Sequence, residues 1–137
     1  MASIYIHIPF CRKACSYCNF YFTTSLKNEN LIIDSIIREI ELRQQDWNEH
    51  TIRSIYFGGG TPSLVNPNHI NKIINKIRSA FPLDKKPEIT LEVNPEDVKQ
   101  ESVNTWLTAG INRISLGVQS FFDHDLSFLG RVHDAKK

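Results

Sequence analysis

Hydrophobic residues alternate along this chain between two periods, one typical of strands and the other of helices. Runs of β-branched and aromatic residues predict four strands, at 3–8, 53–57, 88–93 and 113–117. Apolar positions three and four residues apart predict helices at about 28–45, from 67 onward, at about 96–108, and between 120 and 130. The predicted order is a strand followed by a helix, four times over.

The helical segments carry their own start and stop signals. Asn66 followed by Pro67 predicts a capped helix start, and Gly110 predicts the end of the third helix. Ser120 and Asp123 are interpreted as a capping box for the last helix, which is expected to stop at Gly130. Buried stripes are expected in the first two helices at Leu31, Ile33, Ile36, Ile37 and Ile40, and at Ile70, Ile73, Ile74 and Ile77.

The strands are too continuously apolar for a sheet that is exposed on one face. This pattern predicts an α/β fold, with parallel strands covered by helices, in a single domain. A linker containing Pro82 and Pro87 is expected before the third strand.

Composition narrows the possible partners. The 137 residues are 41% hydrophobic and 23% charged, with a net charge of +1, which argues against nucleic-acid binding. No apolar run approaches the roughly 20 residues of a membrane span, so an integral membrane protein is not expected. The amino-terminal sequence lacks the features of a secretion signal, and the free cysteines favour a reducing, cytoplasmic environment.

All three cysteines lie within eight residues, as Cys11, Cys15 and Cys18. An odd number of thiols cannot pair completely in disulfides, and three is one fewer than the usual four ligands of a zinc or iron–sulfur site. One hypothesis is a structural zinc ion with His7 or His50 as the fourth ligand, and another is three unrelated cysteines. We favour a [4Fe–4S] cluster with three irons bound by cysteine and the fourth open to another ligand.

The motif Cys-x3-Cys-x-Tyr-Cys resembles the signature of the radical S-adenosylmethionine superfamily. The longer string YIHIPFCRKACSYCNFYF is similar to one branch, the oxygen-independent coproporphyrinogen III oxidases and the related haem chaperones. The resemblance implies a partial (β/α)6 barrel, of which residues 1–137 would be the N-terminal portion with the first four βα units. It also implies a [4Fe–4S] cluster whose open iron binds S-adenosylmethionine, and in chaperones possible haem binding.

The same resemblance assigns S-adenosylmethionine contacts at strand ends. Gly58-Gly59-Gly60-Thr61 matches a family motif whose backbone binds the methionyl amino end, and no lysine of a nucleotide P-loop follows it. Glu92 and Gln119 match further cofactor positions. The alternatives are a simple glycine turn, an internal salt bridge from Glu92 to Arg113, and a loop hydrogen bond from Gln119.

Tyr5, Tyr17 and Arg131 also match family positions that contact S-adenosylmethionine, the alternatives being core packing for the tyrosines and solvation for the arginine. His7 is expected to support the site through hydrogen bonds. His124 and His133 are expected at the surface, although either could contact haem. No catalytic residue is assigned.

Two features favour the chaperone branch over the oxidases. The oxidase pattern has a further cysteine after the triad, whereas Asn19-Phe20-Tyr21-Phe22 follows Cys18 here, and the first strand begins almost at Met1. The expected function is therefore transfer of haem to an acceptor protein, with an electron donor such as flavodoxin or ferredoxin. The alternatives are an oxidase acting on a porphyrin precursor, and a small iron–sulfur module without S-adenosylmethionine chemistry.

Overall fold

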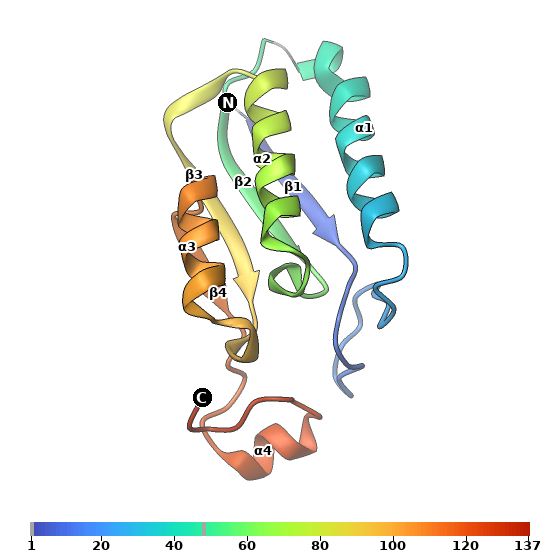
Figure 1. The fold of residues 1–137 in the computed structure, drawn as a ribbon, viewed down its shortest axis with the longest axis vertical. Helices are drawn as coiled ribbons and strands as arrows, with labels where there is room; N and C mark the ends of the chain where they lie inside the picture. The colour runs from blue at the N-terminus through green and yellow to red at the C-terminus, as the bar shows by residue number, and fades with distance from the viewer. Residues whose placement is uncertain (1, 48) are drawn as a thin grey trace.

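The computed structural model describes residues 2–47 and 49–137, and in them four strands alternate with four α-helices (Figure 1). The strands are β1 (Ala2–Ile8), β2 (Ile52–Gly59), β3 (Leu83–Val93) and β4 (Arg113–Leu116). The helices are α1 (Glu29–Trp47), α2 (Pro67–Ala80), α3 (Gln100–Ala109) and α4 (Asp123–Phe128), and two 3-10 turns are η1 (Pro62–Leu64) and η2 (Pro95–Asp97). All neighbouring strands are parallel, in the order β1-β2-β3-β4.

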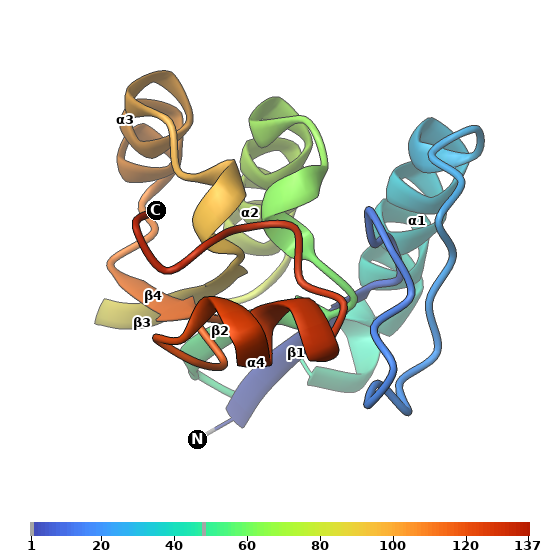
Figure 2. The same ribbon diagram turned by 90° about the horizontal axis from the view of Figure 1, so that it is seen from below.

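The first three helices lie together on one face of the sheet, and α4 lies beyond the carboxyl ends of the strands (Figures 1 and 2). The hydrophobic core fills the space between sheet and helices, with Phe57, Ile74 and Leu91 fully buried. The other face is more open, since Tyr5 and Leu116 are about half exposed at 55% and 48%. The expected α/β fold is confirmed, but helices α1–α3 cover only one face.

Several local signals acted as predicted. The Asn66 side chain caps α2 by accepting a hydrogen bond from the Asn68 amide, and Pro67 occupies the first helical position. The whole predicted stripe of α2 is buried. Gly110 ends α3 in the left-handed conformation at φ 99°, which residues with a Cβ adopt at a cost.

Strand β3 begins at Leu83, within the segment expected to be a linker. Its pairing with β2 changes register between Leu83 and Glu88, and Pro87 lies in that irregular stretch. A proline is tolerated there because the ladder does not need its missing N–H group. The linker prediction was therefore wrong for residues 83–87.

The predicted helix starts at 96 and 120 also need correction. Residues 95–97 form η2, and α3 starts only at Gln100. Ser120 forms no capping box with Asp123, because its hydroxyl accepts from the Phe122 amide and donates to Asp125. In α1, Leu31 is 64% exposed rather than part of the buried stripe.

Candidate functional site

A cavity of about 360 Å³ lies at the carboxyl ends of the strands, where parallel α/β folds carry their functional groups. The cysteine loop, the turn after β2, the end of β3 and the segment around α4 all contribute to its wall. The wall includes ten residues singled out from the sequence: Cys11, Cys15, Tyr17, Cys18, Gly59, Gly60, Thr61, Glu92, Gln119 and Arg131. The predicted site residues are thus brought together, with the exception of Tyr5.

The cysteine loop is closed at its base by backbone hydrogen bonds. The Thr23 amide donates to the Pro9 carbonyl at 2.7 Å, and the Cys11 amide donates to the Thr23 carbonyl at 3.0 Å. A turn bonds the Cys18 amide to the Cys15 carbonyl at 3.1 Å. These contacts fix where the loop leaves the sheet and hold all three thiols at the cavity.

The glycine turn lets two backbone segments pass close together. The Gly60 amide donates to the Ile8 carbonyl and the Thr61 amide to the Phe10 carbonyl, at 2.8 and 2.6 Å. A Cβ at Gly60 would lie 2.6 Å from the Phe10 carbonyl oxygen. Glycine is therefore required here by the approach of the strand that leads into Cys11. The Thr61 hydroxyl then reaches the Cys11 sulfur at 3.6 Å.

Glu92 lies at the end of β3 and is partly buried. One oxygen accepts from the Tyr56 hydroxyl at 2.7 Å, and the other accepts from the Gly59 amide at 3.3 Å. Arg113 pairs instead with Glu88 at 3.2 Å, so the suggested salt bridge from Glu92 to Arg113 is absent among the described residues. Glu92 thus presents a carboxylate to the cavity that is held by hydrogen-bond donors.

Arg131 reaches the cavity from the segment after α4. Its guanidinium donates to Asn94 Oδ1 at 2.8 Å and to the Gly117 carbonyl at 3.0 Å, and it lies 3.3 Å from the Tyr17 hydroxyl and 3.8 Å from the Cys15 sulfur. Its Nε is buried and has no hydrogen-bond partner in the described residues. Arg131 is therefore part of the site rather than a solvated side chain.

Asn94 is a site residue that the sequence analysis missed. Besides accepting from Arg131, its amide nitrogen donates to the Thr61 hydroxyl at 3.2 Å. It thus links the glycine turn to the segment after α4. Its place directly after the third strand, two residues beyond Glu92, was the signal that could have indicated it.

Gln119 and Tyr5 occupy special positions. Gln119 borders the cavity with φ at 68°, a left-handed conformation that is uncommon for a residue with a Cβ and is often found at functional sites. Tyr5 lines a second cavity of about 420 Å³ between β1 and α1. Its ring stacks on Tyr56 with centroids 6.1 Å apart, so packing accounts for part of its role.

Burial and the positive charge of Arg131 shift the pKa values of Cys11 and Tyr17 in opposite directions. Burial raises the pKa of the Cys11 thiol, the Thr61 hydroxyl lowers it, the other two cysteines raise it and Arg131 lowers it. Burial also raises the pKa of Tyr17, against the lowering effect of Arg131. The net result is a raised pKa of the Cys11 thiol, which Arg131 opposes by favouring the thiolate, the form that binds iron or zinc.

The metal-binding side chains predicted from the sequence are three cysteine thiols at the cavity. Within residues 2–47 and 49–137, no three His, Cys, Asp or Glu side chains lie close enough together to hold one metal ion. Each cysteine of a [4Fe–4S] cluster binds a different iron, so its thiols need not converge on one point. His7 hydrogen-bonds to the Tyr21 carbonyl and the Tyr5 hydroxyl, in keeping with the supporting role expected for it.

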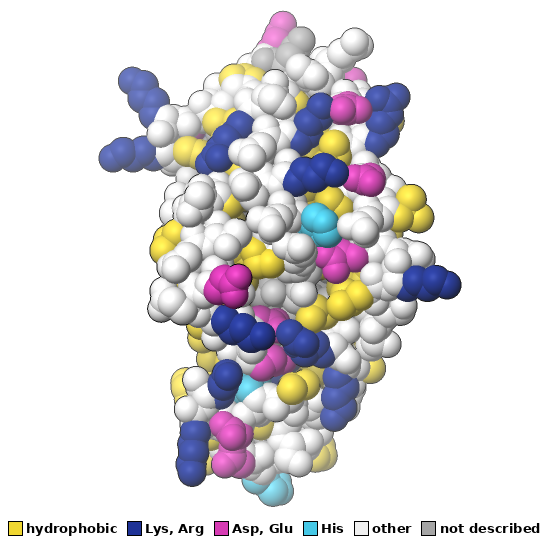
Figure 3. Space-filling model, viewed as in Figure 1, with side chains coloured by type: hydrophobic (Ala, Val, Ile, Leu, Met, Phe, Trp, Pro, Cys, Tyr) yellow, Lys and Arg dark blue, Asp and Glu magenta, His cyan; other side chains and the backbone are white. Residues whose placement is uncertain are grey.

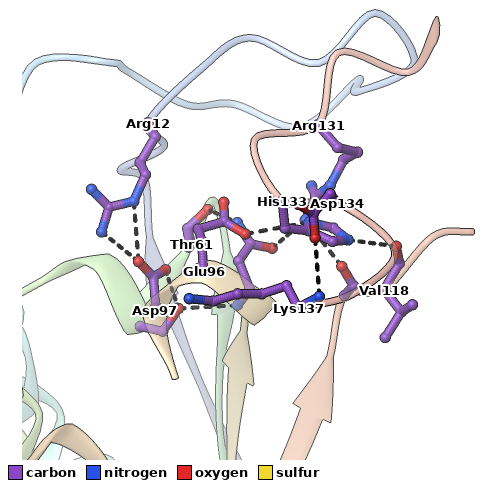
Figure 4. A network of polar contacts seen from close by, with 12 residues as sticks. Arg12, Thr61, Glu96, Asp97, Val118, Arg131, His133, Asp134 and Lys137 are labelled. Atoms are coloured by element: carbon purple, nitrogen blue, oxygen red, sulfur yellow. Dashed lines mark hydrogen bonds and ion pairs between the residues drawn. The ribbon is translucent and has the colours of Figure 1, made fainter. Parts of the chain in front are cut away.

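The turn η2 contains a second feature that sequence reasoning missed. Asp97 is almost fully buried, accepts from the Ser63 hydroxyl at 2.7 Å, and pairs with Arg12 of the cysteine loop (Figure 4). The pair of Arg12 and Asp97 ties the cysteine loop to the end of β3.

On the surface, acidic side chains are flanked by several Lys and Arg side chains in the lower half of the view in Figure 3.

Comparison with known families and proteins gives a consistent result. Residues 5–137 match the family model described as "Radical SAM superfamily". Relatives include "Heme chaperone HemW" of Buchnera aphidicola subsp. Acyrthosiphon pisum, 37% identical over 98% of this chain and 36% of that protein. The bovine "Radical S-adenosyl methionine domain-containing protein 1, mitochondrial" is 35% identical over 98% of this chain and 31% of its own length. The chain thus spans about a third of these relatives.

Solved structures support the fold assignment. The coproporphyrinogen III oxidase HemN from Escherichia coli, described as a radical SAM enzyme, superposes with a TM-score of 0.88 at 29% identity, over 96% of this chain and 31% of that one. An archaeal Elp3 from Methanocaldococcus infernus shares the fold alone, with a TM-score of 0.57 at 15% identity, over 98% of this chain and 33% of its own. In the described part of the chain, no helix has the length and apolar character needed to span a membrane.

Proposed function

This chain belongs to the radical SAM superfamily, and we propose that its cavity holds a [4Fe–4S] cluster together with S-adenosylmethionine. Cys11, Cys15 and Cys18 would each bind one iron. The observation that carries this proposal is that the three thiols share one cavity with a glycine turn, a carboxylate and an arginine. When bound and reduced, the cluster would supply the electron for cleavage of S-adenosylmethionine.

The other residues of the cavity would bind and orient S-adenosylmethionine. Its amino acid end carries both a positive and a negative charge, and Glu92 and Arg131 supply the opposite charges at the cavity. The amides of Gly59, Gly60 and Thr61 are already bonded within the chain, so their backbone carbonyls would be the groups that accept from the amino end of the cofactor. Gln119, Tyr17 and Tyr5 would complete the contacts. We assign no catalytic acid or base.

For the whole protein, we propose transfer of haem to an acceptor protein, with these residues as the N-terminal portion of a longer domain. The relatives named as haem chaperones and the absence of a fourth cysteine in the sequence support this function. The shares of 36% and 31% of the relatives' lengths support the proposal that these residues are part of a longer protein. Haem itself would be the cargo, and an electron donor such as flavodoxin or ferredoxin a further partner.

A second candidate is oxidation of a coproporphyrinogen, which the TM-score of 0.88 to the HemN structure favours. The two activities can be distinguished by an assay of the full-length protein. A chaperone would bind haem and deliver it to an apoprotein without consuming coproporphyrinogen III under reducing, anaerobic conditions. Loss of substrate carboxylates in that assay would instead support the oxidase.

The cofactor proposal is tested by anaerobic reconstitution with iron and sulfide, followed by EPR spectroscopy of the reduced protein. A [4Fe–4S] signal that changes on addition of S-adenosylmethionine is expected. Cys15→Ala should abolish the cluster, whereas Glu92→Ala should keep the iron and weaken S-adenosylmethionine binding. A signal indifferent to S-adenosylmethionine would favour a simple iron–sulfur module, and retention of zinc instead of a cluster would overturn the proposal.

A further inference from the structure

The segment after α4, residues 130–137, carries Arg131 to the cavity and is itself fastened at several points. The Arg131 amide donates to the Leu126 carbonyl at 2.8 Å. The Ala135 amide donates to Asp123 Oδ1 at 2.7 Å. These bonds tie the segment to α4, but they do not tie it to the sheet.

Besides Arg131 itself, which bonds to Asn94 and Gly117, His133 connects the segment to the sheet side. His133 was expected at the surface and is instead 8% exposed. Its Nε2 lies 3.1 Å from the Val118 carbonyl oxygen, and its Nδ1 lies 3.4 Å from Glu96 Oε2 of η2 (Figure 4). Both Nδ1 and Oε2 are buried, and neither has a hydrogen-bond partner elsewhere in the described residues. His124, by contrast, is 94% exposed in its side chain, as expected.

The partners of the ring determine where its protons lie. A carbonyl oxygen can only accept, so the bond to Val118 requires a proton on Nε2. An Nδ1 without a proton would then face a carboxylate oxygen, and two buried acceptors would lie together without a donor. The side chains are only 2% and 12% exposed, so water offers little compensation. A second proton between Nδ1 and Oε2 resolves the conflict.

We propose that Glu96 and His133 form a latch, an ion pair between an imidazole ring protonated on both nitrogens and a carboxylate, which fastens residues 130–137 to η2. By holding this segment, His133 positions Arg131 at the cavity. His133 is thus a positioning residue, two positions from the arginine that contacts Asn94 and Gly117. The latch requires no bound group, and only its consequence for S-adenosylmethionine rests on the proposed function.

Hydrogen exchange tests the coupling between the two side chains. In the complete chain without added iron, Glu96→Ala and His133→Ala should each speed exchange at the Arg131 and Ala135 amides by about tenfold. The double variant should exchange no faster than either single variant, because the two side chains act through one contact. His124→Ala, which alters an exposed histidine of α4, should leave exchange unchanged. Additive effects, or no effect of Glu96→Ala, would overturn the latch.

Nitrogen NMR of the histidine rings tests the latch directly in the unaltered chain. Two protonated nitrogens are expected for His133, assigned by the loss of its signals in His133→Gln. Conversion of Glu96 to Gln should return the ring to a single proton, since a neutral amide can donate to Nδ1. An unprotonated Nδ1 in the unaltered chain would contradict the proposal.

The positioning role has its own readout in the reconstituted protein. Glu96 borders the cavity, so the effect on binding is best measured at His133. His133→Ala should weaken S-adenosylmethionine binding by about tenfold with iron and sulfide content unchanged. His133→Gln, which keeps one donor, should recover part of the affinity. Unchanged affinity in His133→Ala would refute the positioning role, whereas failure of the unaltered chain to take up a cluster would refute the proposed function and leave the exchange result standing.

Discussion

Glu92 lies at the carboxyl end of β3 with its two oxygens directed to the Tyr56 hydroxyl and the Gly59 amide. A partly buried carboxylate is thus held by two neutral donors rather than by a cation, and its negative charge remains available to a positively charged ligand. The same charge acts on the phenol that donates to it. Burial raises the pKa of Tyr56 first, and the bond to Glu92 raises it further.

Glu92→Gln is expected to lower the pKa of Tyr56, because the substituted amide carries no charge. The pKa should stay above the ordinary value of 10.0, since burial is the larger cause of the shift. The raised pKa means that Tyr56 stabilises the fold below pH 10, and that this contribution is lost as the pH rises through the folded-state value. Ultraviolet titration of the phenolate and urea unfolding at alkaline pH would measure both effects.

Glu88→Gln is the matched control, since Glu88 lies on the same strand but is exposed and pairs with Arg113. It should leave the tyrosine titration nearly unchanged. Tyr5 will move in the same direction as Tyr56 in the Glu92 variant, because its pKa is raised by burial and then by Glu92. An unchanged titration curve in Glu92→Gln would show that the carboxylate does not act on these phenols.

At the residue scale, sequence motifs predicted which side chains border the cavity. They did not predict what surrounds each side chain. The cysteine spacing indicated the three thiols and the resemblance to a family motif indicated Glu92, and all four side chains border the cavity. The burial of His133 was not predictable, because it depends on Glu96, a residue 37 positions earlier that only the fold brings near. The pattern of residues along the sequence contains no signal for a contact between His133 and Glu96.

Among the elements, η2 has an influence larger than its three residues suggest. Its adjacent carboxylates point to different segments, Asp97 to Arg12 of the cysteine loop and Glu96 to His133 (Figure 4). The turn therefore connects both segments that border the cavity to the end of β3. Sequence periodicity extended the third helix through this turn, because the apolar spacing does not distinguish a 3-10 turn from the first turn of an α-helix.

Asp97→Ala is expected to loosen the cysteine loop, because it removes the partner of Arg12 and leaves the Ser63 hydroxyl without its acceptor. Asp97 is 2% exposed but Arg12 is 44% exposed in the side chain, so we expect a loss of about 1–3 kcal/mol of stability. Trypsin cleavage after Lys13 should become several-fold faster, with unfolding by urea as the second measurement.

Asp34→Ala provides the control for the Asp97 variant, since Asp34 forms an exposed ion pair with Lys72 between α1 and α2. Its effect should be below about 1 kcal/mol, as is usual for exposed pairs. Arg12→Ala combined with Asp97→Ala should be no more protease-sensitive at Lys13 than Asp97→Ala alone. Equal cleavage rates in the unaltered chain and Asp97→Ala would mean that the loop is held by its base alone.

Across the whole molecule, the hydrophobic core and the cavity occupy different places. The core lies between the sheet and α1–α3, with Phe57, Ile74 and Leu91 at 0% exposure, whereas the cysteine loop projects from the carboxyl edge. The strand and helix order predicted the parallel sheet because each element has its own periodicity. It did not predict that one face of the sheet is left open. The apolar character of a strand indicates burial, but it does not show which elements cover each face of the sheet.

This separation predicts that the chain folds without iron. Structural zinc domains unfold when the metal is removed because their cores are too small, but here the core is built from the helices and strands themselves. The iron-free chain should therefore keep its helical circular dichroism and a cooperative thermal transition, and reconstitution should add protease protection mainly within residues 11–22. Ile74→Ala, which opens a cavity in the core, should lower the stability of both forms by about 2–5 kcal/mol. Loss of cooperative unfolding in the iron-free chain would instead show that the cysteine loop is part of the folding unit.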